Sequence, residues 1–177
     1  MSKVRVATVW LDGCSGCHMS FLDIDERLID LADKIDLVYS PLVDAKDFPA
    51  GVDVALVEGA ISSESDLHKI KEIRENTRIL VSLGDCAVTG NVPSMRDVYP
   101  VSEVLSCVYD DIEHPESTIP DRIVPRLLKK VRPIHEVVPV DVFVPGCPPS
   151  ANVIFNVISE LLQGKIPETV AGARFGA

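Results

Sequence analysis

The segment VRVATVWLDGCSGC, residues 4–17, joins a run of apolar and β-branched residues directly to a loop with two cysteines. Val4 to Leu11 has the composition of a buried strand, and the small residues that follow end it. Two later segments repeat this order of strand and then cysteine, namely Gly84-Asp85-Cys86-Ala87 and Pro145-Gly146-Cys147-Pro148-Pro149. Four of the five cysteines therefore come directly after predicted strands.

Further strands are expected where short β-branched runs recur, at Ile35 to Ser40, Val52 to Val57, Arg78 to Leu83 and Val140 to Val144. Between them, apolar residues at helical spacing predict helices over Met19 to Lys34, Ser65 to Glu75, Pro120 to Val131 and Pro148 to Gly164. Strands that alternate with helices are typical of a doubly wound parallel sheet with helices on both faces. The predicted fold class is α/β.

The length of 177 residues is usual for one domain, and we expect residues 1–177 to form a single one. The stretch from Asn91 to Pro120 contains Pro93, Pro100 and Pro115, and we expect it to leave the sheet as irregular structure. Hydrophobic residues make up 46% of the chain, aromatics only 5%, and the mean hydropathy is +0.20. This excess indicates apolar surface kept for a partner or a parallel sheet buried on both faces.

The charge balance and the absence of long apolar runs exclude several classes of protein. A net charge of −10 argues against a nucleic-acid binder, which needs a basic surface to neutralise phosphates. No apolar run is close in length to the about 20 residues that a membrane span needs, so we expect no membrane segment. The first strand begins at Val4 without a charged leader or twin-arginine signal, and we expect a cytoplasmic protein. In that reducing compartment, the cysteines point to metal or cluster binding rather than to disulfides.

Cysteines that follow parallel strands are expected to meet, because the carboxyl ends of such strands share one edge of the sheet. Four thiolates suit either tetrahedral zinc or an iron–sulfur cluster, since both prefer sulfur ligands. Structural zinc usually draws on two cysteine pairs, whereas this chain has one pair, Cys14 and Cys17, and the single residues Cys86 and Cys147. This pattern favours a [4Fe–4S] cluster over zinc. A redox-active dithiol at Cys14 and Cys17 is a third interpretation, although it needs no further cysteines.

Other residues receive individual predictions. Glu58 ends the central strand and is expected to face the same edge, beside the cluster, or else to be a capping or loop glutamate. Cys107 lies in an apolar run and is expected to be a buried small hydrophobe. Trp10 is expected in the core. All four histidines are expected to be structural or surface residues, namely His18, His68, His114 and His135. For His18, which directly follows Cys17, a place beside the cluster ligands is the alternative. Neither G-x-G-x-x-G nor G-x-x-x-x-G-K-[ST] occurs, so no dinucleotide or P-loop site is predicted.

Four segments taken together resemble the small subunit of [NiFe] hydrogenases and its relative, the cluster-bearing subunit of respiratory complex I. They are LDGCSGC at 11–17, VEGA at 57–60, GDCAVTGNVP at 84–93 and PGCPPS at 145–150. The chain is most similar to the short small subunit of cytoplasmic NAD-reducing hydrogenases, because the twin-arginine signal and two-cluster domain of longer small subunits are absent. Complex I relatives have adjacent cysteines where this chain has Cys14-Ser15-Gly16-Cys17, which favours a hydrogenase.

The resemblance implies a flavodoxin-like fold that binds one proximal [4Fe–4S] cluster through Cys14, Cys17, Cys86 and Cys147. It implies an electron-transfer subunit that relays electrons from a nickel–iron site in a large subunit toward iron–sulfur and flavin diaphorase subunits that reduce NAD⁺. FMN and NAD are then expected on partner subunits, since Cys14 and Cys17 occupy the loop that would hold a flavin phosphate. The alternatives are a hydrogenase or complex I-like small subunit with another acceptor, and a zinc-stabilised interaction module.

Overall fold

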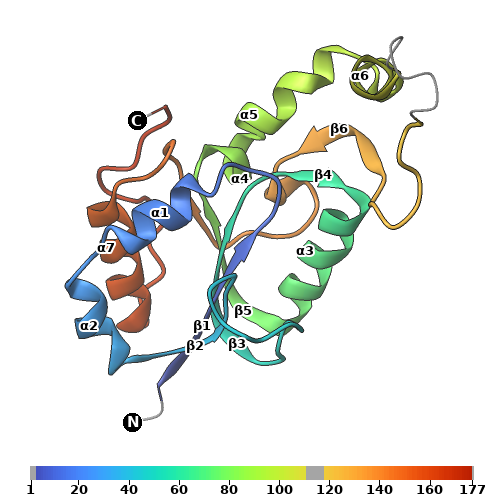
Figure 1. Ribbon diagram of the computed structural model, residues 1–177. Helices are drawn as coiled ribbons and strands as arrows, with labels where there is room; N and C mark the ends of the chain where they lie inside the picture. Colours follow the sequence, from blue (N-terminus) through green and yellow to red (C-terminus); the bar gives the residue numbers. More distant parts are fainter. Residues whose placement is uncertain (1–2, 111–117, 177) are drawn as a thin grey trace.

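A computed structural model describes residues 3–110 and 118–176 of the chain (Figure 1). Its centre is a five-stranded sheet in the order β2-β1-β3-β5-β7, in which all neighbouring strands are parallel. The strands of this sheet are β1 (Val4–Trp10), β2 (Ile35–Tyr39), β3 (Val52–Glu58), β5 (Thr77–Leu83) and β7 (Val142–Val144). The five predicted strands are all present, and the predicted α/β, flavodoxin-like fold is confirmed.

Helices cover both faces of the sheet because the strands are apolar on both sides. Val54 and Leu56 of β3 pack on one side with α1 (Gly16–Leu22), α2 (Arg27–Ala32) and α7 (Ala151–Leu162). Ala55 and Val57 pack on the other side with α3 (Glu64–Asn76). Figure 1 shows these two layers, with α1, α2 and α7 on one side of the sheet and α3 on the other.

The first predicted helix, Met19 to Lys34, is divided in two. Turns at residues 23–26 separate α1 from α2, and Asp25 has a φ of 58°. Aspartate visits this left-handed region more readily than most residues, so the chain can change direction there without a glycine. The apolar positions of both pieces still face the sheet, since Phe21, Ile24 and Leu31 lie in one core cluster.

The predicted helix over Pro120 to Val131 is wrong. The segment instead ends in a strand, β6 (Leu127–Arg132), which pairs antiparallel with the short strand β4 (Ile61–Ser63) in a separate two-stranded sheet. Ile61 pairs with Arg132, and the Glu64 backbone N–H donates to the Arg126 carbonyl at 2.9 Å. The backbone bonds of this segment go to a distant part of the chain, which the local apolar spacing does not reveal.

The irregular structure expected from Asn91 onward is also wrong for the described residues up to 109. After α4 (Asp85–Thr89), the chain forms α5 (Asn91–Ser94), the 3₁₀ helix η1 (Met95–Val98) and α6 (Val101–Tyr109). We call residues 91–109 the helical arm. Figure 1 shows it extending away from α4. His114 and Pro115 lie outside the described residues.

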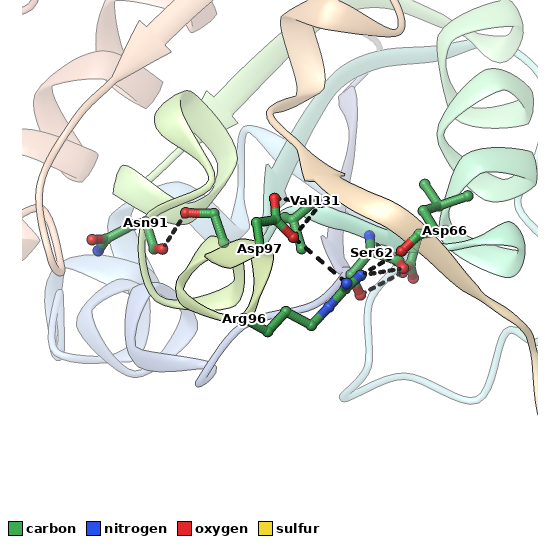
Figure 2. A network of polar contacts seen from close by, with 8 residues as sticks. Ser62, Asp66, Asn91, Arg96, Asp97 and Val131 are labelled. Carbon is green, nitrogen blue, oxygen red and sulfur yellow. Dashed lines mark hydrogen bonds and ion pairs between the residues drawn. The ribbon is translucent and has the colours of Figure 1, made fainter. Parts of the chain in front are cut away.

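A polar network fastens the helical arm to the two-stranded sheet (Figure 2). Arg96 donates from Nη2 to the carbonyl oxygens of Ser62, at 3.2 Å, and Leu128, at 3.0 Å. Asp97 accepts from the Val131 backbone N–H at 2.9 Å. The two strands therefore hold the base of the arm next to α4, the helix that contains Cys86.

Side chains at the outer part of the arm are exposed or half-buried. None of the residues of α6 is buried, although most of them are apolar. Cys107 is exposed there, so its predicted burial is wrong, and Trp10 is 39% exposed rather than a core residue. No helix in the described part of the chain is long and apolar enough to cross a membrane.

Candidate metal centre

The loops after β1, β5 and β7 meet at the carboxyl edge of the sheet, because these strands end at the same level. Trp10 pairs with Glu58, Glu58 with Leu83, and Leu83 with Val144. Beyond these residues lies a pocket of about 70 Å³. Its lining includes all four predicted ligand cysteines and is formed by Gly13, Cys14, Gly16, Cys17, Glu58, Gly59, Asp85, Cys86, Gly146, Cys147 and Pro148.

The first loop is fixed at the beginning of α1. Ser15, the N-cap residue, has a φ of 65°, which turns the chain between Cys14 and Cys17. The His18 backbone N–H donates to Glu58 Oε2 at 2.7 Å, and His18 Nδ1 lies 2.9 Å from the same oxygen. Glu58 therefore attaches the first turn of α1 to the end of the central strand.

The second loop approaches the first so closely that only glycine fits between them. Gly84 has a φ of 84°, and a Cβ atom built on it would lie 2.2 Å from Cys17 Sγ. The next residues, Asp85 and Cys86, begin α4. The backbone N–H of Val92 donates a hydrogen bond to the Cys86 sulfur.

The third loop is hydrogen-bonded to the second loop and to α1, the helix that follows the first loop. Asp85 N–H donates to the Gly146 carbonyl at 2.9 Å, and Gly146 N–H donates to Asp85 Oδ1 at 2.6 Å. The Ser20 hydroxyl of α1 donates to the Pro149 carbonyl at 2.5 Å. Asn91 Nδ2 lies 3.6 Å from Cys147 Sγ and donates to it. The pocket is thus built from loops that hold one another in place.

The electrostatics of the pocket oppose free thiolates. Burial raises the pKa of the Cys17 thiol well above its ordinary value, and the Glu58 carboxylate and the other three cysteines of the pocket raise it further. Burial also raises the pKa of Cys86, and the Val92 N–H partly offsets this effect. Positive charge among the sulfurs would instead favour the thiolates, since metal ligation deprotonates thiols outright. The donor set therefore fits a cationic metal group.

The spacing of the ligands bears on which group fits. In the described ranges 3–110 and 118–176, no three His, Cys, Asp or Glu side chains are close enough together to hold a metal ion. A single zinc would need four sulfurs within about 2.3 Å of one point. The four cysteines instead surround a space, which suits a group that has a volume of its own.

The remaining predicted residues occupy different environments. Glu58 is buried and lines the pocket. His18 is only 3% exposed, its Nε2 has no hydrogen-bond partner among the described residues, and its ring lies edge-on to Trp10 at 5.3 Å between centroids. His68 and His135 are exposed. Asp85 was not singled out from the sequence, where its only signal is its position directly before Cys86.

Known proteins resemble the chain over nearly its whole length. The family model described as "NADH ubiquinone oxidoreductase, 20 Kd subunit" matches residues 14–161. The NAD-reducing hydrogenase HoxS subunit delta of Cupriavidus necator is 42% identical over 168 residues, which cover 92% of this chain and 80% of that protein. A subunit of the vhu F420-non-reducing hydrogenase of Methanocaldococcus jannaschii is 40% identical, and the match covers 93% of this chain but only 58% of that protein.

Solved structures agree with these relatives. A chain in the crystal structure of an NAD⁺-reducing [NiFe]-hydrogenase in the H₂-reduced state superposes with a TM-score of 0.93 and 40% identity, covering 99% of this chain and 100% of that one. A chain of the [NiFeSe]-hydrogenase of Dm. baculatum has a TM-score of 0.62 at 19% identity, which shows a shared fold. The resemblance indicated by the four motifs is confirmed, and the chain belongs to the family of the NADH ubiquinone oxidoreductase 20 Kd subunit.

Proposed function

We propose that this chain is the electron-transfer small subunit of a cytoplasmic, NAD-reducing [NiFe] hydrogenase, folded as a single domain over residues 1–177. In this proposal Cys14, Cys17, Cys86 and Cys147 hold one [4Fe–4S] cluster. The observation that carries it is the pocket at the carboxyl edge of the sheet, which these four side chains line together. Their arrangement around a space favours a cluster over a single zinc ion.

The residues of the pocket divide into ligands and groups that act on them. A bound cluster would supply one-electron transfer at a single site. The Val92 N–H and the Asn91 amide donate hydrogen bonds to the Cys86 and Cys147 sulfurs, and such bonds favour the additional negative charge of the reduced state. Glu58 acts in the opposite direction, because its carboxylate is negative and lines the same pocket.

Hydrogen chemistry is assigned to a partner. All four pocket cysteines are used as cluster ligands in this proposal, so none remains for a nickel–iron site on this chain. The nickel–iron site is assigned to a separate large subunit, and FMN and NAD to iron–sulfur and flavin diaphorase subunits. The support for these partners is the similarity to the delta subunit of an NAD-reducing hydrogenase, of which the match covers four fifths.

A small subunit with another electron acceptor is the second candidate, and a specific observation favours keeping it. The relative from an F420-non-reducing hydrogenase is 40% identical to this chain, nearly as similar as the delta subunit. The cysteine pocket supports an electron relay in either case. The electron acceptor depends on which subunits accompany the chain.

Anaerobic purification of the native complex through a tag on this chain tests both points. We expect a brown complex that contains nickel, a flavin, about four irons assignable to this chain, and H₂-dependent NAD⁺ reduction. A complex without a flavin subunit that reduces a different acceptor would support the second candidate. A colourless protein that contains zinc and no iron would overturn the cluster and favour the interaction module.

A further inference from the structure

Asp85 has an unusual place among the residues of the pocket, because its carboxylate contacts two separate segments of the chain. It is only 5% exposed. Oδ1 accepts the Gly146 N–H at 2.6 Å, and Oδ2 accepts the Gly176 N–H at 2.7 Å. The buried carboxylate of Asp85, the residue before Cys86, thus binds both the loop of Cys147 and the end of the described chain.

The second of these contacts concerns the segment that follows α7. Residues 165–176 form neither helix nor strand, yet they return to the end of the sheet where the cysteines lie. Val170 and Ala173 pack against the core on the side of α7. Gly172, Ala173 and Arg174 border a cavity together with Pro145 and Pro148, which flank Gly146 and Cys147. Figure 1 shows the C-terminal end near α1 and α4, at this edge of the sheet.

We propose that Asp85 is a positioning residue that couples the Cys86 and Cys147 loops to the C-terminal segment, and that residues 172–176 form a strap over the Cys147 side of the pocket. Hydrogen bonds from backbone N–H groups to a buried carboxylate are charge-assisted and stronger than neutral ones. If the carboxylate is lost, two N–H groups are left without their acceptor at a site where water has little access. Both loops and the strap would then loosen together.

Coupling of this kind acts in both directions. A docked strap keeps the Cys147 loop in the position that completes the pocket, and a completed pocket in turn keeps Gly146 and Asp85 in the position that docks the strap. The iron part of the test rests on the proposed cluster. The strap itself is observable in hydrogen exchange whether or not the chain binds iron.

Three variants of the native complex test the proposal. Asp85→Asn retains one carbonyl oxygen and replaces the other acceptor by a donor, so only one of the two N–H groups keeps its bond. A chain ending at Ala171 removes the strap and leaves the bond from Gly146 to Asp85. Phe175→Ala is the matched control, because it alters an exposed side chain of the strap and leaves the Gly176 N–H in place.

The measurements are the rate of iron loss to a chelator and the hydrogen exchange of residues 165–176. We expect Asp85→Asn and the shortened chain to lose iron about 10- to 100-fold faster, because removing groups that support metal ligands typically weakens metal affinity by that factor. Asp85→Asn should also speed exchange in the strap, while Phe175→Ala matches the wild type in both measurements. Wild-type rates of iron loss in the shortened chain, or unchanged strap exchange in Asp85→Asn, would overturn the proposal. A wild-type chain without iron would instead overturn the proposed function.

Discussion

One oxygen of the Glu58 carboxylate, Oε2, lies 2.7 Å from the backbone nitrogen of His18 and 2.9 Å from its Nδ1. The two residues come from the end of β3 and the first turn of α1, and both are almost fully buried. This pair fixes the residue directly after Cys17. Glu58 therefore has two separable effects on the pocket, one through the position of the loop and one through its charge.

The charge of Glu58 is expected to lower the reduction potential of the site, since a negative group disfavours an added electron. Glu58→Gln keeps an oxygen that can accept the His18 N–H and removes the charge. We predict normal iron content and a midpoint potential that rises by tens of millivolts, roughly the effect of one charge nearby in a protein interior. Redox titration followed by electron paramagnetic resonance measures this shift, with the exposed Glu75→Gln as control. If Glu58→Gln and Glu75→Gln have the same midpoint potential, Glu58 acts on the pocket only through the position of the loop.

Substitution of each cysteine by serine shows which cysteines are cluster ligands. We predict that the variants Cys14→Ser, Cys17→Ser, Cys86→Ser and Cys147→Ser each fall clearly below about four irons per chain. Cys107→Ser should keep the wild-type content, because Cys107 is exposed on α6 and does not line the pocket. Iron analysis and visible absorption are sufficient to read the result. Loss of iron in the Cys107 variant together with retention in the Cys86 variant would show that the assignment is wrong.

A methyl group at Gly84 is predicted to damage the site far more than one at Gly164. Both residues have positive φ, 84° and 76°, so alanine is strained by about 1 to 2 kcal/mol at either position. At Gly164 nothing lies within 4 Å of the added Cβ, whereas at Gly84 Cys17 Sγ is 2.2 Å away. Gly84→Ala should lose iron, and Gly164→Ala should only lower the free energy of unfolding. Iron content and denaturant titration compare the two, and equal iron contents would contradict the close packing.

Removal of the metal should reveal the raised pKa of Cys17. Only a thiolate reacts readily with an alkylating reagent. In the metal-free chain at pH 8, we predict that Cys17 is labelled more slowly than the exposed Cys14 and Cys147, as mass spectrometry of the peptides would show. If Cys17 is labelled as fast as Cys14, the pocket does not suppress its ionisation.

The same raised pKa predicts how stability depends on pH. Below the ordinary cysteine pKa of 9.0, Cys17 carries its proton in both the folded and the unfolded chain. As the pH rises above 9.0, the unfolded chain loses this proton while the folded chain keeps it. The free energy of unfolding of the metal-free chain should therefore fall with increasing alkalinity. Cys17→Ser should weaken that dependence, and an identical slope in the variant would contradict the prediction.

The chain expressed alone is predicted to aggregate, because exposed apolar side chains lie along the helical arm. Val98 is 77% exposed and Val108 is 66% exposed. We expect Val98→Gln and Val108→Gln together to reduce light scattering of the isolated chain, with a change in unfolding free energy within about 0.5 kcal/mol for each surface substitution. A wild-type chain that stays monodisperse without any partner would contradict this expectation.

Much of the sheet could be predicted because its signals are local. Buried parallel strands are continuous β-branched runs, as in Val52–Glu58, and each begins and ends near the limits expected from the sequence. The gathering of Cys14, Cys86 and Cys147 followed from one topological rule, that parallel strands present their carboxyl ends along one edge. These predictions needed no knowledge of which side chains touch.

The errors concern residues whose environment depends on distant parts of the chain. The strand Leu127–Arg132 exists because it pairs with Ile61–Ser63, and nothing within its own residues shows that partner. The apolar run around Cys107 indicated burial, but it lies on a helix that no described residue covers enough to bury. Asp85 was missed because a carboxylate that accepts two backbone N–H groups is recognised only when the donors are known.

The position of β7 has a consequence for the order in which the protein is made. This strand is three residues long and lies at the edge of the sheet beside β5, and the loop that contains Cys147 follows it. During synthesis, Cys14 and Cys17 leave the ribosome more than a hundred residues ahead of that loop. The pocket cannot exist until the chain has emerged beyond Cys147 and β7 has joined the sheet. If the proposed cluster needs all four sulfurs, its insertion therefore follows folding, and a chain stalled before residue 147 offers only part of the site.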